Sequence, residues 1–369
     1  MAHAGRRWTR RGFLLTGLAS AAAASQGRKP PEFPTFPSGA RGFPDPSTGL
    51  EVVRLTDPAW FSTLPAYYNR AIASHGGYLL FTCGRTGSPQ AFRLDLKTAE
   101  SQQLTGAGGL DGATLALTPD NRAFCYCAGR SLFLAKFGSK EREVYRVPEG
   151  WERGRGVTVA PDGAAATLVE TRAGASRLRT IPLRAGAPRT VFESAAAISD
   201  PLPRPRHAQT LYRSGGRGLW LVDHGGRGNR RLELASGRIA AALWAPDGRT
   251  LLYLLLPEDP AQLHSIREHS PDTGADKPIA RTSQFACFSA NRDTSVFAGA
   301  SENRGSPYVL LLLRATGAEK TLCEHRATDA AAVCPVFSPD SQQLFFQSDR
   351  DGKPAIYSVR LDQLVEKTA

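Results

Sequence analysis

The feature that most constrains the fold is a unit of 41 to 49 residues that recurs seven times. Each copy begins with a polar turn, as in "PDGRTLLY" or "PDSQQLFF", and continues into an apolar strand of four to six residues. The copies start at Ser74, Pro119, Pro161, Pro205, Pro246, Ala290 and Pro339. Such a period is typical of propeller blades, because one blade cannot bury both of its faces and neighbouring blades must stack.

The repeat predicts an all-β fold, a seven-bladed β-propeller of four-stranded antiparallel blades. The last copy ends near Leu361 and supplies only three strands. The segment "EVVRLT" (Glu51–Thr56) precedes the first copy and has the pattern of an outer strand. We therefore predict that this N-terminal strand completes the seventh blade and closes the ring, which covers open strand edges. The propeller is expected over residues 48–366.

The first 25 residues have the pattern of an export signal. Arg10 and Arg11 precede a short apolar run, and "TRRGFL" resembles the twin-arginine pattern. The run is too short to cross a bilayer as a helix, so no transmembrane segment is expected once the signal is removed. We predict a periplasmic or secreted protein. Residues 26–47 are rich in Pro and Gly and are predicted to be a linker.

The composition indicates the kind of partner. The formal net charge of +12 favours an anionic partner. Basic runs interleaved with aromatic residues, as single-strand binders need, are not evident, and export also argues against nucleic acid. The six cysteines are scattered without a CxxC pair, which predicts buried free thiols rather than a disulfide framework.

Two stretches of the chain resemble known propellers. The ending "SDRDGKPAIYSVRL" (Ser348–Leu361) looks like the blades of TolB-type propellers. This ending also resembles oligogalacturonate lyases, together with the front of the chain, "VVRLTDP" (Val52–Pro58) and "YYNRAIASHGGYLLFTCGRTGSPQAFRLDLKTAESQQLT" (Tyr67–Thr105). This resemblance implies a seven-bladed propeller that cleaves short pectin fragments by β-elimination. It further implies a manganese ion held by three His and one Gln, with a His and an Arg acting on the sugar.

The positions that match the family's metal ligands carry other residues in this chain. They are Asp329, Ala332, Cys334 and Gln284. In the fifth blade, Ala241 stands where related sequences often carry His. The resemblance therefore implies a degenerate metal site, and we expect no manganese cofactor. Asp200 could join Asp329 and Cys334 in a replacement site, although manganese prefers oxygen donors to thiolate.

Four residues are candidates for binding the substrate, namely Asn69, Arg70, Arg155 and Arg204. Arg70 stands where the family has a basic residue on the first inner strand, and Arg204 follows the altered motif of the fourth blade. Arg155, in "RGRGVTV", is expected beside the channel. A guanidinium can hold a uronate carboxylate through two parallel hydrogen bonds. The alternative for each arginine is an exposed loop position.

Two functions remain open from the sequence, and no catalytic residue is assigned. The first is a lyase-like protein that acts on oligogalacturonate or a related uronate through an altered site. If active, it would be a polysaccharide lyase. The second is a non-catalytic, TolB-like propeller that binds an anionic glycan or a periplasmic protein. The missing His residues favour binding, whereas the resemblance favours the lyase family.

Overall fold

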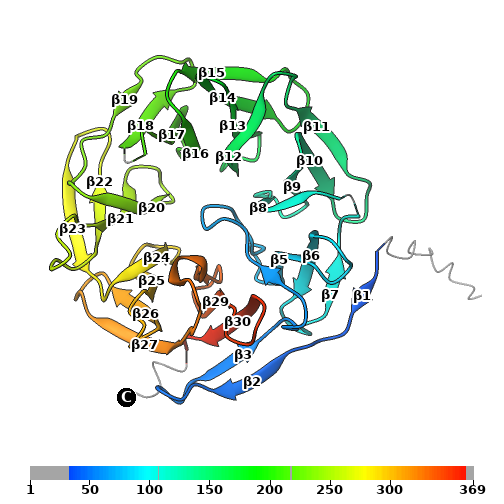
Figure 1. Cartoon of the computed structure of the whole chain (residues 1–369), viewed down its shortest axis with the longest axis vertical. Helices are drawn as coiled ribbons and strands as arrows, with labels where there is room; N and C mark the ends of the chain where they lie inside the picture. The colour runs from blue at the N-terminus through cyan, green and yellow to red at the C-terminus, as the bar shows by residue number, and fades with distance from the viewer. Residues whose placement is uncertain (1–32, 107, 217, 363–369) are drawn as a thin grey trace, which may run out of the picture. The chain divides into compact units, whose positions relative to one another are not determined.

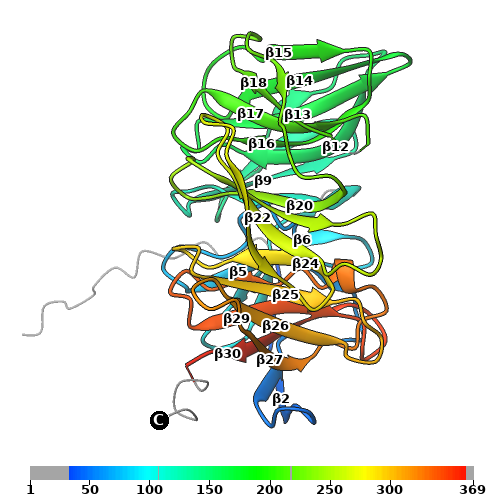
Figure 2. The same cartoon turned by 90° about the vertical axis from the view of Figure 1, so that its left-hand side faces the viewer.

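The computed structural model describes residues 33–106, 108–216 and 218–362. Within these residues, seven antiparallel sheets surround a central axis (Figure 1). Seen from the side, the sheets stack one beside the next around the ring (Figure 2). The prediction of an all-β, seven-bladed propeller is therefore confirmed.

The strands of each blade follow one another from the axis outwards. Blade 1 contains β4 (Ser62–Thr63), β5 (Tyr78–Cys83), β6 (Gln90–Asp95), β7 (Ser101–Gln103) and, outermost, β1 (Thr35–Phe36). Blade 2 contains β8 (Leu110–Leu117), β9 (Ala123–Ala128), β10 (Ser131–Lys136) and β11 (Arg142–Arg146). Blade 3 contains β12 (Glu152–Val159), β13 (Ala165–Arg172), β14 (Ala175–Pro182) and β15 (Arg189–Ser194).

The remaining blades have the same plan. Blade 4 contains β16 (Ile198–Pro203), β17 (Gln209–Ser214), β18 (Gly218–Asp223) and β19 (Arg230–Arg231). Blade 5 contains β20 (Arg238–Trp244), β21 (Leu251–Leu256), β22 (Ser265–His269) and β23 (Asp276–Arg281). Blade 6 contains β24 (Phe285–Ala290), β25 (Val296–Ser301), β26 (Tyr308–Leu313) and β27 (Glu319–Glu324). The 3₁₀ turn η1 (Ala330–Ala332) leads into blade 7, which contains β28 (Val336–Phe337), β29 (Gln343–Ser348), β30 (Ala355–Arg360), β3 (Glu51–Arg54) and β2 (Arg41–Pro44).

The repeated polar turn joins the inner strand of a blade to its second strand. In five blades, the aspartate of this turn accepts a hydrogen bond from the backbone N–H two residues later, which closes an Asx-turn. These residues are Asp120, Asp162, Asp247, Asp293 and Asp340. In blade 1, Nδ1 of His75 takes the same role and accepts from the Gly77 N–H at 3.1 Å. The repeat thus reflects the local chemistry of one turn.

In blades 1, 2, 3, 5 and 6 the second strand is the most buried element. All six residues of β21, with the sequence LLYLLL, are buried, and so are all six of β5. Adjacent blades cover both faces of such a strand, so it forms a continuous apolar run instead of an alternating pattern. The core consists of clusters between neighbouring blades, such as Leu211 of blade 4 with Tyr253 and Leu255 of blade 5.

The N-terminal strand closes the ring, as predicted. β3 pairs antiparallel with β30, and Val52 lies opposite Val359. Val52 is fully buried among residues of blades 6 and 7. The backbone N–H of Leu55 extends the pairing and donates to the Ile356 carbonyl at 2.7 Å. Two segments some 300 residues apart therefore share the sheet of blade 7.

Part of the predicted linker is sheet. β1 and β2 lie within residues 26–47, which are predicted to be a linker, and they pair with β7 and β3. The outer edges of blades 1 and 7 offer free backbone groups, and a Pro-rich segment is tolerated at such an edge. The export signal predicted for residues 1–25 lies outside the described residues. No helix in the described ranges is long and apolar enough to span a membrane.

All six cysteines lie in the described part of the chain, and all are free. Five are buried, and Cys334 is partly exposed. The prediction of free thiols without a disulfide framework agrees with this arrangement.

Candidate functional site

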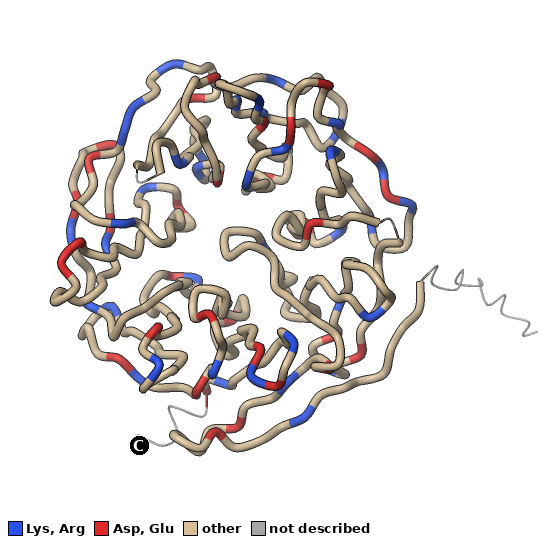
Figure 3. The backbone as a smooth tube through the Cα atoms, in the orientation of Figure 1, with Lys and Arg blue, Asp and Glu red and all other residues tan. Residues whose placement is uncertain are grey.

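The loop between β4 and β5 occupies the centre of the ring (Figure 1). It is mostly uncharged, whereas basic and acidic positions are interspersed around the blades (Figure 3). The hydroxyl of Tyr67 accepts a hydrogen bond from the Ala242 N–H at 3.1 Å, and the hydroxyl of Tyr68 donates to Oδ1 of Asp200 at 3.4 Å. The central loop is thereby bonded to the inner strands of blades 4 and 5.

Asn69, a predicted substrate-binding residue, holds this loop against two further blades. Its Nδ2 donates to the carbonyls of Ala113 in blade 2, at 3.1 Å, and of Val157 in blade 3, at 3.0 Å. The side chain is buried, and its Oδ1 has no hydrogen-bond partner among the described residues. In this conformation the amide group of Asn69 serves the assembly of the channel wall.

A cavity of about 540 Å³, here called the channel cavity, lies beside the central loop. One side is small and apolar and comes from blades 5 to 7: Ala240, Ala241, Ala286, Cys287, Ala331 and Cys334. The other side is polar and comes from the central loop and blades 2 and 3: Tyr67, Tyr68, Asp111, Thr114, Arg153 and Arg155. Its size and its mixed lining suit a small polar ligand.

Of the four residues predicted to bind the substrate, Arg155 on β12 is the one that lines the channel cavity. Its side chain is 82% exposed, and its Nε lies 3.2 Å from Oδ1 of Asp200, which is only 7% exposed. Nε of Arg213 lies 3.6 Å from the other oxygen of Asp200. A guanidinium has five N–H donors in a planar fork. Arg155 therefore retains donors for a ligand while its position is set by Asp200.

The backbone around this ion pair has an unusual conformation. β12 bulges between Arg153 and Val157, and Gly156 has a φ of +94°. A Cβ atom on Gly156 would lie 2.8 Å from the Cα of Asp200, so only glycine allows the two strands to approach so closely. Asp200 itself has a φ of +50°, a left-handed conformation that is costly for a non-glycine residue. Such conformations cluster at functional sites.

A second ion pair lies at the same wall. Nη2 of Arg153 is 2.6 Å from Oδ2 of Asp111, which joins the inner strands of blades 3 and 2. Three guanidinium groups, those of Arg153, Arg155 and Arg213, thus share the two carboxylates Asp111 and Asp200. The polar wall of the cavity has an excess of positive charge.

The structure does not place Arg70 in the channel cavity. Its Nη1 donates to the Pro119 carbonyl at 2.9 Å, its Nη2 to Oδ1 of Asn121 at 2.6 Å, and its Nε to the Ile72 carbonyl. Desolvation lowers the pKa of this arginine. The guanidinium is used to hold the turn of blade 2 against blade 1.

Arg204 is also committed to packing. Its side chain is fully buried, and its Nη1 and Nη2 lie 2.9 and 2.5 Å from the two carboxylate oxygens of Asp272. Its Nε donates to the Gly248 carbonyl at 2.7 Å, and the guanidinium carbon lies 5.3 Å from the ring centroid of Trp244. Arg204 joins blade 4 to blade 5 and does not line the channel cavity.

Comparisons with known proteins agree with this architecture. The family model described as oligogalacturonate lyase matches residues 36–172. The oligogalacturonide lyase of Pectobacterium atrosepticum and the oligogalacturonate lyase of Dickeya dadantii are each 24% identical over 375 residues, covering 88% of this chain and 96% of each relative. The chain is similar in sequence to oligogalacturonate lyases.

Solved structures have the same fold. An oligogalacturonate lyase in complex with manganese superposes with a TM-score of 0.85 at 23% identity, covering 90% of this chain and 99% of the other. An oligogalacturonate lyase from Vibrio parahaemolyticus gives a TM-score of 0.82 at 21% identity, covering 89% and 98%. The lyase-like resemblance predicted from the first and last blades is confirmed.

The residues at the positions that the resemblance matches to metal ligands make a poor donor set for manganese. Asp329 is exposed and caps η1 by accepting from the Ala331 N–H, and Ala332 has no donor side chain. Gln284 lines a groove between blades 5 and 6 instead of the channel cavity. Desolvation raises the pKa of the Cys334 thiol to about 11, so it is protonated near neutral pH. Manganese prefers oxygen donors.

The suggested replacement set of Asp200, Asp329 and Cys334 is not brought together. Among the described residues, no three His, Cys, Asp or Glu side chains meet in an arrangement suited to a metal ion. Asp200 instead forms ion pairs with Arg155 and Arg213.

Sequence reasoning missed the two tyrosines of the central loop. Burial raises the pKa of Tyr67, although nearby Arg213 opposes the shift, and burial together with Asp200 raises the pKa of Tyr68. In the sequence, the adjacent "YY" contributes to the resemblance to the family but carries no other sign of a function. It lies in a loop before the first repeat, and no local pattern shows that this loop reaches the axis.

Proposed function

We propose that this lyase-like propeller binds a short uronate oligosaccharide, such as pectin-derived oligogalacturonate, in the channel cavity, with a metal site altered from that of its relatives. The observation that carries the proposal is the exposed guanidinium of Arg155, which is positioned by the buried carboxylate of Asp200. Charge-assisted, bidentate hydrogen bonds make arginine well suited to a carboxylate ligand.

The charge balance of the polar wall supports an anionic ligand. Asp200 is shared between Arg155 and Arg213, at 3.2 and 3.6 Å, so neither arginine has a carboxylate of its own. A uronate carboxylate would give Arg155 a second partner at the side of the guanidinium that faces the cavity. Because Arg155 is exposed, this attraction should weaken as salt is added.

Efficient β-elimination is not expected of this cavity. The reaction needs a cation at the uronate carboxylate, a base for the neighbouring C–H and tolerance of the leaving oxygen. Arg155 can supply the first requirement. Of the described residues that line the cavity, none is a histidine. The raised pKa values of Tyr67 and Tyr68 make their hydroxyls poor bases near neutral pH.

The test is a calorimetric titration of the purified protein with trigalacturonate. Arg155→Ala is expected to weaken binding by about tenfold, the loss typical of a charged hydrogen-bonded contact. The matched control is Arg249→Ala, which removes an equally exposed arginine from the turn at the far end of β20. Equal affinities for the Arg155 variant and the control would refute the proposed site.

The metal site is tested by the ultraviolet absorbance of the unsaturated product, with and without manganese and chelator. We expect no efficient turnover and no tight binding of manganese in a separate titration. Loss of even one ligand or its support commonly weakens a metal site by about tenfold or more. Turnover that chelator abolishes would contradict the altered site.

A further inference from the structure

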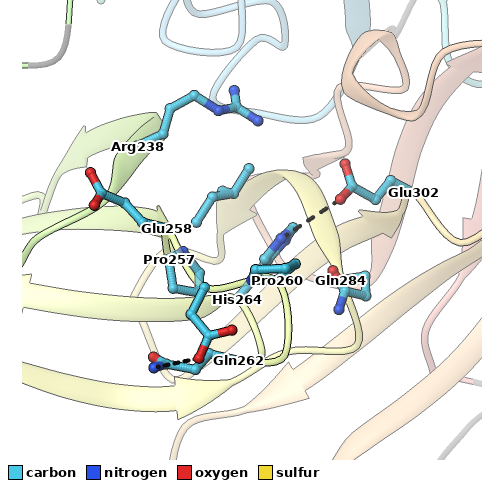
Figure 4. A pocket seen from close by; sticks show the side chains of 10 residues that line it. Arg238, Pro257, Glu258, Pro260, Gln262, His264, Gln284 and Glu302 are labelled. Carbon is cyan, nitrogen blue, oxygen red and sulfur yellow. Dashed lines mark hydrogen bonds and ion pairs between the residues drawn. The ribbon is translucent and has the colours of Figure 1, made fainter.

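A groove of about 620 Å³ opens between blades 5 and 6 (Figure 4). It lies under the loop that joins β21 to β22 and is lined mainly by polar side chains, including Arg238, Gln262, His264, Gln284 and Glu302. None of these residues was assigned a role in the channel cavity. The volume is within the range of small-ligand sites.

The groove adjoins the channel cavity along two inner strands. On β20, Arg238 lines the groove, whereas Ala240 and Ala241 line the channel cavity. On blade 6, Gln284 lines the groove, and Ala286 lines the channel cavity just beyond it. The two linings are therefore only two or three residues apart along the chain in each blade. A ligand longer than one sugar can therefore reach both.

The imidazole of His264 is held in one orientation in the groove. Its side chain is 10% exposed, and its Nδ1 lies 2.9 Å from the Phe285 carbonyl. A carbonyl only accepts hydrogen bonds, so Nδ1 carries the proton and Nε2 is the acceptor of the neutral ring. Nε2 faces Glu302, whose Oε1 lies 3.7 Å away, beyond hydrogen-bonding distance (Figure 4). Nε2 and Oε1 are then both acceptors, and each can accept a hydrogen bond from a separate sugar hydroxyl.

The groove also offers a cation. Arg238 is exposed at its rim, and its guanidinium has no hydrogen-bond or ion-pair partner among the described residues. The lining also carries three carboxylates, those of Glu258, Asp259 and Glu302, which oppose it in charge. Asp259 is engaged by its own loop, through the Ala261 N–H and the Gln262 side chain, and Glu302 faces His264. Among the described residues that line the groove, Arg238 thus supplies a cation without a partner, and several other side chains supply acceptors for hydroxyl groups.

We infer that this groove is a second sugar subsite, which receives the neighbouring unit of an acidic oligosaccharide whose first carboxylate lies at Arg155. The inference rests on the proposed function of the channel cavity. Arg238 would bind the carboxylate of the second unit, and the acceptors Glu302 and Gln284 would bind its hydroxyls. The protein would then prefer oligomers to the single sugar.

The test is the affinity for D-galacturonate, digalacturonate and trigalacturonate, measured by calorimetry at one low salt concentration. For the wild type, we expect the oligomers to bind about tenfold more tightly than the monomer. Arg238→Ala should remove about fivefold of this gain and leave the affinity for the monomer unchanged. Glu302→Ala, which removes an acceptor for the sugar hydroxyls, should weaken oligomer binding and leave the affinity for the monomer unchanged. The matched control is Arg292→Ala, at the opposite end of β24, which should have no effect.

The outcomes separate the two proposals. If monomer and oligomers bind equally well to the wild type, the second subsite is refuted and the channel site stands. The inference is also refuted if Arg238→Ala weakens monomer and oligomer alike, or behaves as Arg292→Ala does. If no galacturonate species binds, both proposals fall.

Discussion

Replacing the buried Arg204 by Ala is expected to destabilise the propeller without directly removing a contact to the ligand. The sequence suggests that this arginine binds a uronate, but the structure uses every part of its guanidinium between blades 4 and 5. The variant therefore tests whether Arg204 belongs to the fold or to the binding site.

The expected magnitude follows from the contacts that Arg204 makes. The Gly248 carbonyl would lose a buried donor, which costs about 1–3 kcal/mol. The cation–π contact with Trp244 contributes about 0.5–2 kcal/mol. The ion pair with Asp272 adds only about 0–1 kcal/mol, because that carboxylate is 54% exposed and becomes solvated. Since neighbouring contacts are not additive, we expect a loss of about 3 kcal/mol in the free energy of unfolding.

The assay is thermal unfolding followed by circular dichroism, together with the trigalacturonate titration. A loss of this size should lower Tm by about 6 °C in a domain of this length. Arg206→Ala is the control, because Arg206 is exposed in the same turn, and its loss should change stability by less than about 0.5 kcal/mol. An Arg204→Ala protein that keeps its Tm but no longer binds trigalacturonate would refute the structural role.

Two further predictions concern stability. Val52→Ala should lower the free energy of unfolding by about 2 kcal/mol, because Val52 is fully buried where β3 closes the ring. Glu51 is exposed on the same strand, so the control Glu51→Ala should have little effect. Equal melting temperatures for the two variants would count against closure by β3. Burial lowers the pKa of His325, whose Nδ1 accepts from the Ala327 N–H at 3.0 Å and whose Nε2 donates to the Ser301 carbonyl. The stability that comes from keeping this ring neutral is present above the unfolded-state pKa of about 6.5 and is lost as the pH falls through the lower folded-state value. Urea unfolding between pH 7.5 and 5 should therefore show a smaller loss of stability for His325→Gln than for the wild type, and parallel curves would contradict this account.

The architecture was predictable because it depends on short-range chemistry that is repeated. Each Asx-turn, such as those at Asp120 and Asp340, needs only an aspartate and the N–H two residues later. In the sequence, the last copy of the repeat lacks a fourth strand, and the segment at Glu51 precedes the first copy. Together these two features indicate that the N-terminal strand closes the ring. The short strands in the predicted linker were not predictable, because they form only where blade edges are already available.

The site was predicted only in part, because long-range partners decide how each arginine is used. In the sequence, each of the three candidate arginines lies near an inner strand, and no local feature distinguishes Arg70, Arg155 and Arg204. Arg204 is withdrawn into the core by Asp272, 68 residues away, and Arg70 by the turn of the next blade. Arg155 stays at the cavity because Asp200 and the glycine bulge of β12 hold it there.

The sequence by itself determined the number of blades, their turns and the closure of the ring, because these follow from local hydrogen bonding and from the burial of apolar runs. Only the tertiary structure decided which side chains face the channel. A bulge of one residue reverses the direction of the side chains that follow it. Inner strands bulge in blades 2 to 6, and in blades 2, 3, 5 and 6 the bulge lies at residues that line the channel cavity. The central loop that carries Tyr67 and Tyr68 reaches the axis through contacts with distant blades, which no local pattern encodes.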